Sequence, residues 1–146
     1  MPAPPVLGTL ESSLYARDPV AAERFYAGTF GLAVVARQKG RHVFFRVGGS
    51  ILPVLNPEAT ATGPRPGANL PARAHGASGP GDDCLAVEEA ALDAWRAHLL
   101  AEGIVIAADF RWPNGARSLH VLDPAGNSVE LADPASGRDA APSAAA

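Results

Sequence analysis

Cysteine is nearly absent from this sequence, which has only Cys84 among 146 residues. One cysteine cannot form a disulfide within the chain, and it cannot supply the paired thiolates of a zinc knuckle. This scarcity suits a reducing compartment. Apolar runs of the ~20 residues that cross a membrane are also lacking, as is the charged and then apolar start of a secretory signal. We therefore expect a cytoplasmic protein that does not associate with membranes.

Positive charge is in short supply as well. Lysine and arginine total 12 residues against 15 aspartates and glutamates, which gives a net charge of -3. A dedicated nucleic-acid binder normally carries a basic patch, so this class of function is not expected. Hydrophobic residues make up 47% of the chain, which is enough for one domain of ordinary size with a core of its own.

Glycine and proline, in contrast, are plentiful, with 15 and 14 residues, and they are unevenly spread. Many gather in residues 58–79, which have neither helical nor strand periodicity and are predicted to form a linker. Residues 1–7 and 135–146 are predicted to be flexible tails. Between the tails we expect a single domain, residues 8–134, with one module at 8–57 and a second at 80–134.

The two modules have the same predicted order of elements. Asp18 is a good helix N-cap, Pro19 suits the first helical position, and Gly31 would end the helix. Apolar periodicity predicts a strand, this helix and three further strands at residues 9–16, 19–30, 33–38, 42–47 and 51–56. The second module repeats the order at residues 82–87, 88–103, 104–110, 116–122 and 127–132.

Superposing the modules indicates an internal duplication, since Glu11 falls on Asp82 and Leu52 falls on Glu130. Chance similarity is the alternative, but the order of elements and the glycines that end both helices favour duplication. A βαβββ unit buries little surface alone, so the two units must pack together. The sequence therefore predicts an α+β fold of two tandem βαβββ modules that form a curved mixed sheet around a shared cleft.

Strand alternation predicts which residues line this cleft. In each strand, apolar residues occupy the face that a helix would cover, and the other face is left for the cleft. That second set contains Glu11, Asp82, His120 and Glu130. His120 and Glu130 lie opposite each other if the turn between them is symmetric, with Cβ atoms ~5 Å apart. Such a pair suits two ligands of one metal ion.

Two stretches of the chain resemble a known family. They are the strand-to-helix entry LESSLYARDPVAAERFYAGTFGL and the closing segment SLHVLDPAGNSVELADP. Both resemble the vicinal oxygen chelate superfamily, which includes glyoxalase, bleomycin-resistance, fosfomycin-resistance and extradiol dioxygenase proteins. That family folds as paired βαβββ modules around a metal cleft. Its metal positions, on the first and last strands of each module, correspond here to Glu11, Leu52, Asp82 and Glu130.

This sequence departs from the family at two of those positions. Neither Leu52 nor Pro53, which takes the position if the register shifts by one, can bind a metal. The second module usually carries histidine where this chain has Asp82, and His120 could replace the lost imidazole. The resemblance implies a divalent metal held by residues from the set Glu11, Asp82, His120 and Glu130. Carboxylates favour manganese or magnesium, and iron, zinc, nickel or no metal at all are the alternatives.

Other residues near the predicted cleft are candidates for substrate binding. Arg111, Trp112 and Arg117 lie in and beside the loop WPNGAR, while Cys84 and His120 are on cleft-facing strand positions. Each candidate also has a structural alternative. The arginines could be exposed loop residues, His120 could be part of the cleft wall, and Asp82 could cap a loop.

Two functions from different classes follow from the resemblance. One is a divalent-metal-dependent isomerase or lyase for a small oxygenated metabolite, in which Glu11 or Glu130 moves a proton. The other is a metal-free protein, similar to bleomycin-resistance proteins, that sequesters a cationic small molecule or drug in an acidic cleft. An extradiol dioxygenase is disfavoured, because its iron site resembles two histidines plus one carboxylate.

We also expect a homodimer, because curved sheets leave strand edges that need covering. The modules could pair within one chain or swap between two chains.

Overall fold

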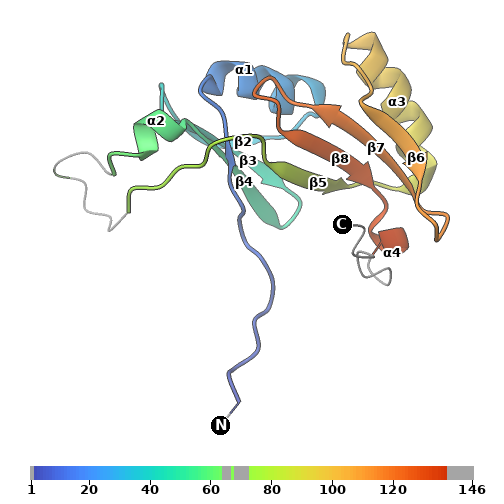
Figure 1. Cartoon of the computed structure of the whole chain (residues 1–146), viewed down its shortest axis with the longest axis horizontal. Coiled ribbons are helices and arrows are strands. Elements are labelled where there is room, and N and C mark those ends of the chain that lie inside the picture. Colours follow the sequence, from blue (N-terminus) through green and yellow to red (C-terminus); the bar gives the residue numbers. More distant parts are fainter. Residues whose placement is uncertain (1, 64–66, 68–72, 138–146) are drawn as a thin grey trace. The chain divides into compact units, whose positions relative to one another are not determined.

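The computed structural model describes residues 2–63, 67 and 73–137. The chain forms two compact units, Met1–Ala77 and Ser78–Ala146, each with one four-stranded sheet (Figure 1). Each unit contains one of the two predicted modules, and we call them the first and the second module. Within the described part of the chain, no helix is long and apolar enough to span a membrane.

The first module has its strands in the order β1-β4-β3-β2, with β1 parallel to β4. Asp18 caps the helix as predicted, since its Oδ1 accepts hydrogen bonds from Val20 N and Ala21 N. The second half of the predicted helix is π-helical, and Phe30 N donates to Phe25 O. The elements are β1 Leu14–Tyr15, α1 Pro19–Glu23, η1 Arg24–Thr29, β2 Val34–Gln38, β3 His42–Val47, β4 Ser50–Leu55 and α2 Pro57–Thr60.

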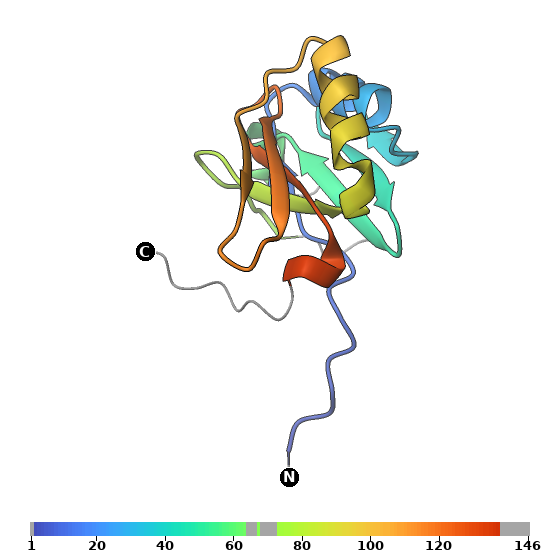
Figure 2. The ribbon, with the colours of Figure 1, turned by 90° about the vertical axis from the view of Figure 1, so that its right-hand side faces the viewer.

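The second module repeats this topology, with the order β5-β8-β7-β6 and with β5 parallel to β8. Figure 2 shows α3 along one side of the strands of this sheet. Its elements are β5 Asp82–Ala86, η2 Glu89–Ala91, α3 Leu92–Ala101, β6 Ala108–Arg111, β7 Arg117–Leu122, β8 Ser128–Ala132 and α4 Pro134–Gly137. The predicted α+β fold with two tandem βαβββ modules is therefore confirmed.

Each sheet buries one face under the helix of its own module. In the first module α1 contacts β3 and β4, and the aromatic rings of Tyr26 and Phe45 pack 5.3 Å apart in the core. In the second module α3 contacts β7, and its buried face carries Leu92 and Leu99. On this buried face of β7 and β8 every residue is apolar, namely Leu119, Val121, Val129 and Leu131. The alternate positions of the same strands are therefore left for another role.

The turn between β7 and β8, with the sequence DPAGN, holds the residue before β5 in place through hydrogen bonds. Asp123 accepts hydrogen bonds from Ala125 N, from Asn127 N and from Asn127 Nδ2. Asn127 Oδ1 then accepts from Gly81 N at 2.7 Å, and Ser128 N donates to Gly81 O. Both Asp123 and Asn127 are buried. This part of the motif thus has a structural role, because it sets the register in which β5 enters the sheet.

The first predicted strand is shorter than expected. Residues 9–16 form only the two-residue β1 and an isolated bridge between Glu11 and Ile51. Ile51 N donates to Leu10 O. Every second residue of β4 directs its backbone N–H toward the same neighbouring segment, so the next donor would be the N–H of residue 53. That residue is Pro53, which has no N–H. The missing hydrogen bond accounts for the gap between the bridge and β1.

The strand predicted at residues 104–110 is observed at Ala108–Arg111. The first residue of the predicted strand, Ile104, instead takes part in the C-terminal cap of α3, where Gly103 adopts a positive φ of +75°. Gly103 N donates to Leu100 O and Ile104 N donates to Leu99 O, which is the Schellman pattern. The amide of Ile104 is therefore used by the helix cap and not by a strand ladder.

Part of the predicted linker folds back on the first module. Asn56 caps the short helix α2 by accepting from Glu58 N, and Arg41 donates to the carbonyls of Ala59 and Gly63. Residues 64–66 and 68–72 of the predicted linker lie outside the described residues. So do residue 1 of the predicted N-terminal tail and residues 138–146 of the predicted C-terminal tail. Residues 2–7 form neither helix nor strand.

Candidate functional site

The second module presents a group of polar side chains on the sheet face opposite α3. Cys84 pairs with Glu130 across β5 and β8, and Glu130 pairs with His120 across β8 and β7. Ser118 is two residues before His120 and therefore lies on the same face. We call this surface the polar face and define it by Cys84, Ser118, His120 and Glu130. The cross-strand pair predicted from the turn, His120 with Glu130, is observed.

Glu130 is the centre of the polar face. Ser118 Oγ donates a hydrogen bond to Glu130 Oε1 at 2.6 Å. His120 Nε2 lies 3.7 Å from the same oxygen, and the two side chains are 23% and 17% exposed. Among the described residues, His120 Nε2 has no hydrogen-bond partner although it is buried. The carboxylate is thus held from one side and has an imidazole nitrogen close to it on the other.

Two aromatic side chains border Ser118 and His120, the two neighbours of this carboxylate. Trp112 follows β6 directly, and its Nε1 donates to Ser118 Oγ at 2.8 Å. Phe110 contacts the ring of Trp112 at 4.8 Å and the ring of His120 at 5.4 Å between centroids. Trp112 is 44% exposed, so part of its ring remains accessible beside the polar groups. The polar face therefore combines an oriented carboxylate with an apolar border.

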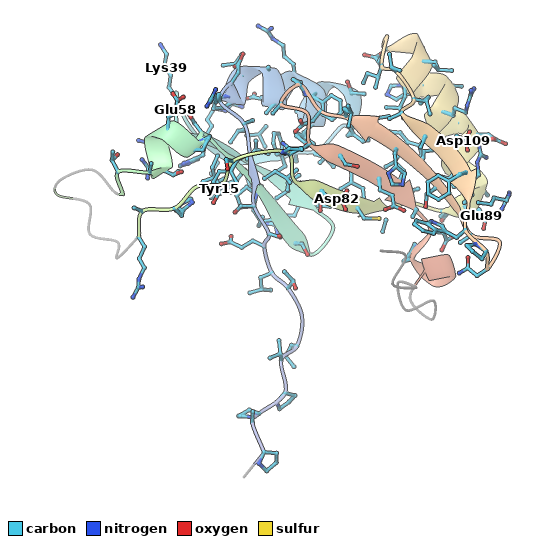
Figure 3. All side chains as sticks on the ribbon, viewed as in Figure 1. Tyr15, Lys39, Glu58, Asp82, Glu89 and Asp109 are labelled. Carbon is cyan, nitrogen blue, oxygen red and sulfur yellow. The ribbon has the colours of Figure 1, made fainter. Side chains whose placement is uncertain are left out.

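Asp82 and Cys84 come from β5, the neighbour of β8. Asp82 pairs with Ser128, which places it at the start of β5 (Figure 3), two positions from Cys84 on an exposed part of the strand. The pKa of the Cys84 thiol is raised to about 12, and partial burial of its sulfur is the largest cause. The charges of Glu130, Asp83 and Asp82, and a hydrogen bond to Glu130, contribute to the same rise. A thiol in this setting stays protonated at neutral pH.

We expect Cys84 to react slowly with iodoacetamide at pH 8. A pKa of about 12 leaves about one thiol in 10,000 ionised, against about one in ten at the ordinary value of 9.0. The greater nucleophilicity of a more basic thiolate offsets about half of this difference on a logarithmic scale. Alkylation should therefore be about 30-fold slower than that of a cysteine peptide, and should accelerate with pH through pH 10.

The matched variant for this measurement is Glu130→Gln. It removes one of the charges that raise the Cys84 pKa, so its alkylation at pH 8 should be faster than that of the parent chain. A parent chain that reacts as fast as the peptide would contradict the perturbed thiol.

The two arginines predicted near the substrate lie on the other side of the sheet. Arg117 bonds both carboxylate oxygens of Asp109, at 2.9 and 3.0 Å, and Asp93 of α3 at 2.6 Å. Arg111 pairs with Glu89 at 3.0 Å and donates to Gly115 O. Asp109 and Glu89 are labelled in Figure 3. These bonds link α3 and η2 to the sheet, and they keep both guanidinium groups apart from the polar face.

Glu11 lies in the first module, where it is exposed and bridges to Ile51. Its role as a ligand or a base stays a prediction, as do the roles of Asp82, His120 and Glu130 as metal ligands. The strand pairing also identifies the counterpart of Glu130 in the first module. Leu14 pairs with Val54 as Leu85 pairs with Leu131, so the preceding residue, Pro53, takes the position of Glu130. The register is the shifted alternative and not the one with Leu52.

A metal ion has few donors on the polar face as it stands. Among residues 2–63, 67 and 73–137, no group of three or more His, Cys, Asp or Glu side chains is placed to hold a metal. His120 Nε2 and Glu130 Oε1 are 3.7 Å apart, a distance that two ligands of one ion can have. These two residues form part of a site and would need a further donor.

Ser118 is the residue of the polar face that the sequence interpretation did not assign to the site. Its strand position on the same face as His120 was visible in the alternation. Its contact with Glu130 could not be inferred from the alternation. The direct cross-strand partner of Glu130 is His120, and Ser118 reaches Glu130 diagonally between the two strands. A small hydroxyl residue two positions from a histidine on a cleft-facing strand is the signal that could have identified it.

Comparison with known proteins gives a consistent match. The family model described as the Glyoxalase/Bleomycin resistance protein/Dioxygenase superfamily matches residues 7–131. The solved structure of lactoylglutathione lyase from Agrobacterium tumefaciens is 39% identical, with a TM-score of 0.82, and the alignment covers 90% of this chain and 96% of that chain. A search of curated proteins found no match.

Two more distant structures share the fold. One is TioX from Micromonospora sp. ML1, which is 22% identical with a TM-score of 0.64 over 86% of this chain and 98% of that chain. The other is the fosfomycin resistance protein FosX from Mesorhizobium loti, at 16% identity and a TM-score of 0.59 over 88% and 92% of the two chains. At these identities the similarity concerns the fold alone.

Proposed function

Because the chain belongs to the glyoxalase/bleomycin resistance protein/dioxygenase superfamily, we propose that it is a lyase or isomerase acting on a small oxygenated metabolite. The observation that carries the proposal is the Glu130 carboxylate on the polar face, with Oε1 held by Ser118. The 39% identity to a lactoylglutathione lyase supports the reaction class. Lactoylglutathione, a thioester of a hydroxy acid, is therefore the first substrate to test.

In this proposal Glu130 is the group that moves the proton. A carboxylate can remove a proton from a carbon next to a carbonyl and return it to a neighbouring atom. Ser118 orients Glu130, while Phe110 and Trp112 add apolar surface beside Ser118 and His120. In this proposal His120 binds a substrate oxygen, and the support is its Nε2, which lies 3.7 Å from the carboxylate and has no hydrogen-bond partner among the described residues.

A divalent metal is part of the proposal, since members of the superfamily commonly bind one. His120 and Glu130 would be two of its ligands, and Asp82 or Glu11 would complete the set. A bound ion would stabilise negative charge on a substrate oxygen. Manganese or magnesium suits the carboxylates, and nickel, zinc or iron suits the imidazole.

We expect the melting temperature to rise when divalent metal is added to protein stripped with a chelator. An ion at a hundredfold excess over its dissociation constant stabilises the folded state by about 2.7 kcal/mol. For a chain of this size, that corresponds to a rise of about 5–10 °C. Differential scanning calorimetry with each metal in turn, and lactoylglutathione turnover in the same samples, provide the measurement.

The control is Glu130→Ala, which should abolish the rise in melting temperature. It should leave the metal-free protein folded, because the side chain is not part of the apolar core. No change in melting temperature with any metal, together with no turnover, would contradict the metal-dependent enzyme.

A second candidate function is sequestration of a cationic small molecule without metal. The observation that favours it is the placing of Phe110 and Trp112 beside His120 and Ser118, the neighbours of Glu130, since aromatic rings and a carboxylate attract cations. In that case an aromatic-binding organic cation would raise the melting temperature and metals would not. For either function we propose a cytoplasmic homodimer, on the grounds of the single cysteine and of the outer strands of each sheet.

A further inference from the structure

The hydrogen bonds that lead from Trp112 to Glu130 have a fixed direction. An indole N–H can only donate, so Ser118 Oγ must be the acceptor in the 2.8 Å contact with Trp112 Nε1. A hydroxyl has one proton, and the 2.6 Å contact with Glu130 Oε1 is where the proton of Ser118 lies. Ionised Glu130 can only accept. Trp112 therefore donates to Ser118, and Ser118 donates to Glu130.

Ser118, the middle residue of this series of hydrogen bonds, is inaccessible to water. Ser118 is 1% exposed, so solvent cannot replace either of its hydrogen bonds. Its two bonds are also coupled, since a hydroxyl that accepts from a donor becomes a stronger donor itself. Removal of the indole N–H would free the Ser118 hydroxyl to turn, and the hold on Glu130 would weaken even though Trp112 does not contact the carboxylate.

We propose that Trp112 and Ser118 are positioning residues, which hold the Glu130 carboxylate in the orientation that proton transfer requires. This inference rests on the proposed function for its catalytic consequence, while the donor chain itself follows from the contacts alone. It gives Trp112 a role that differs from the direct substrate contact expected from the sequence. Its N–H is committed to Ser118, and only its ring remains for other contacts.

The first test detects the hydrogen bonds from Trp112 to Ser118 and from Ser118 to Glu130 without an activity measurement. The chain has two tryptophans, Trp95 and Trp112, so a ¹H–¹⁵N spectrum contains two indole N–H signals, and Trp112→Phe assigns them. We expect Ser118→Ala to move the Trp112 signal, and Glu130→Gln to move it as well, through Ser118. The Trp95 signal should stay in place in both variants. A Trp112 signal that is unmoved by either substitution would overturn the proposal.

The second test is kinetic and uses variants that keep the packing. Trp112→Phe retains an aromatic ring against Phe110 but lacks the N–H, and we expect kcat to fall about tenfold with KM unchanged. Trp95→Phe, which removes an indole from α3, should leave both constants as they are. Ser118→Ala should lower kcat at least as much as Trp112→Phe, and Ser118→Thr, which restores a hydroxyl, should recover part of the loss.

The outcomes separate this inference from the proposed function. A rise in KM with kcat unchanged in Trp112→Phe would make Trp112 a substrate contact and overturn the positioning role. If the parent chain turns over no lactoylglutathione, the proposed function fails, and the two indole signals still decide whether the donor chain holds Glu130.

Discussion

Replacing Glu130 with glutamine is expected to lower kcat/KM by about a thousandfold, the loss that accompanies removal of a general base. Glutamine has nearly the same shape, and its amide oxygen can still accept the hydrogen bond from Ser118 Oγ. What it cannot do is take up a proton. The measurement is steady-state kinetics on lactoylglutathione, with the melting temperature recorded for the same samples to show that the fold is retained.

The matched control for this prediction is Glu89→Gln. Glu89 belongs to the same module but pairs with Arg111, away from the polar face. Its removal should change kcat/KM by less than about twofold, because an exposed ion pair contributes little and has no part in the reaction. If Glu130→Gln retained most of the parent activity, Glu130 would not be the proton-transferring group, and Glu11 would become the residue to test.

Replacing Asp123 with alanine is expected to lower the free energy of unfolding by about 3 kcal/mol. Asp123 is only 4% exposed, and its carboxylate accepts hydrogen bonds from Ala125 N, Asn127 N and Asn127 Nδ2. Each bond to a charged group contributes about 1.5–3 kcal/mol, but the three share one turn and are not additive. Alanine would also remove the acceptor of two donors of the buried Asn127, its N and its Nδ2. Urea unfolding followed by circular dichroism measures the loss.

Asp18→Ala is the control for Asp123→Ala. Asp18 also accepts two backbone hydrogen bonds, but it is exposed and caps a helix, so its loss should cost about 1 kcal/mol. Equal losses of unfolding free energy in the two variants would mean that burial of the Asp123 turn contributes nothing to stability. Asn127→Ala should resemble Asp123→Ala, because it also releases Gly81 N at the start of β5.

Much of the fold could be predicted because local signals and periodicity agree. Asp18 and Pro19 mark the start of the first helix, and the turn residues from Asp123 to Asn127 mark the final hairpin. The errors have local physical causes. Pro53 interrupts the pairing of the first strand from a neighbouring strand, and the cap of α3 takes the amide of Ile104. Neither effect can be recognised from the strand in question by itself.

The candidate site was predictable to the extent that it depends on strand register. His120 and Glu130 are brought together by a short symmetric hairpin, so alternation and turn length were sufficient. The roles of Trp112 and Ser118 depend on side-chain rotamers and a diagonal contact, which the pattern does not specify. The arginines looked alike in the sequence, but Arg117 and Arg111 find carboxylates on the helix side of the sheet. Convergence of Glu11 with Asp82 and Glu130 stays a prediction.

Pro53 also bears on how the two halves of this chain can diverge. It stands where the second module has Glu130, and a proline there lacks both a carboxylate and an amide hydrogen. One codon thus separates the modules in chemistry and in backbone pairing at the same time. At this strand position only the second module can supply a proton-transferring or metal-binding group, whereas the first module offers its candidate, Glu11, directly before the gap in its first strand. The repeat is therefore symmetric in topology but unequal in the chemistry that its two copies offer at this position.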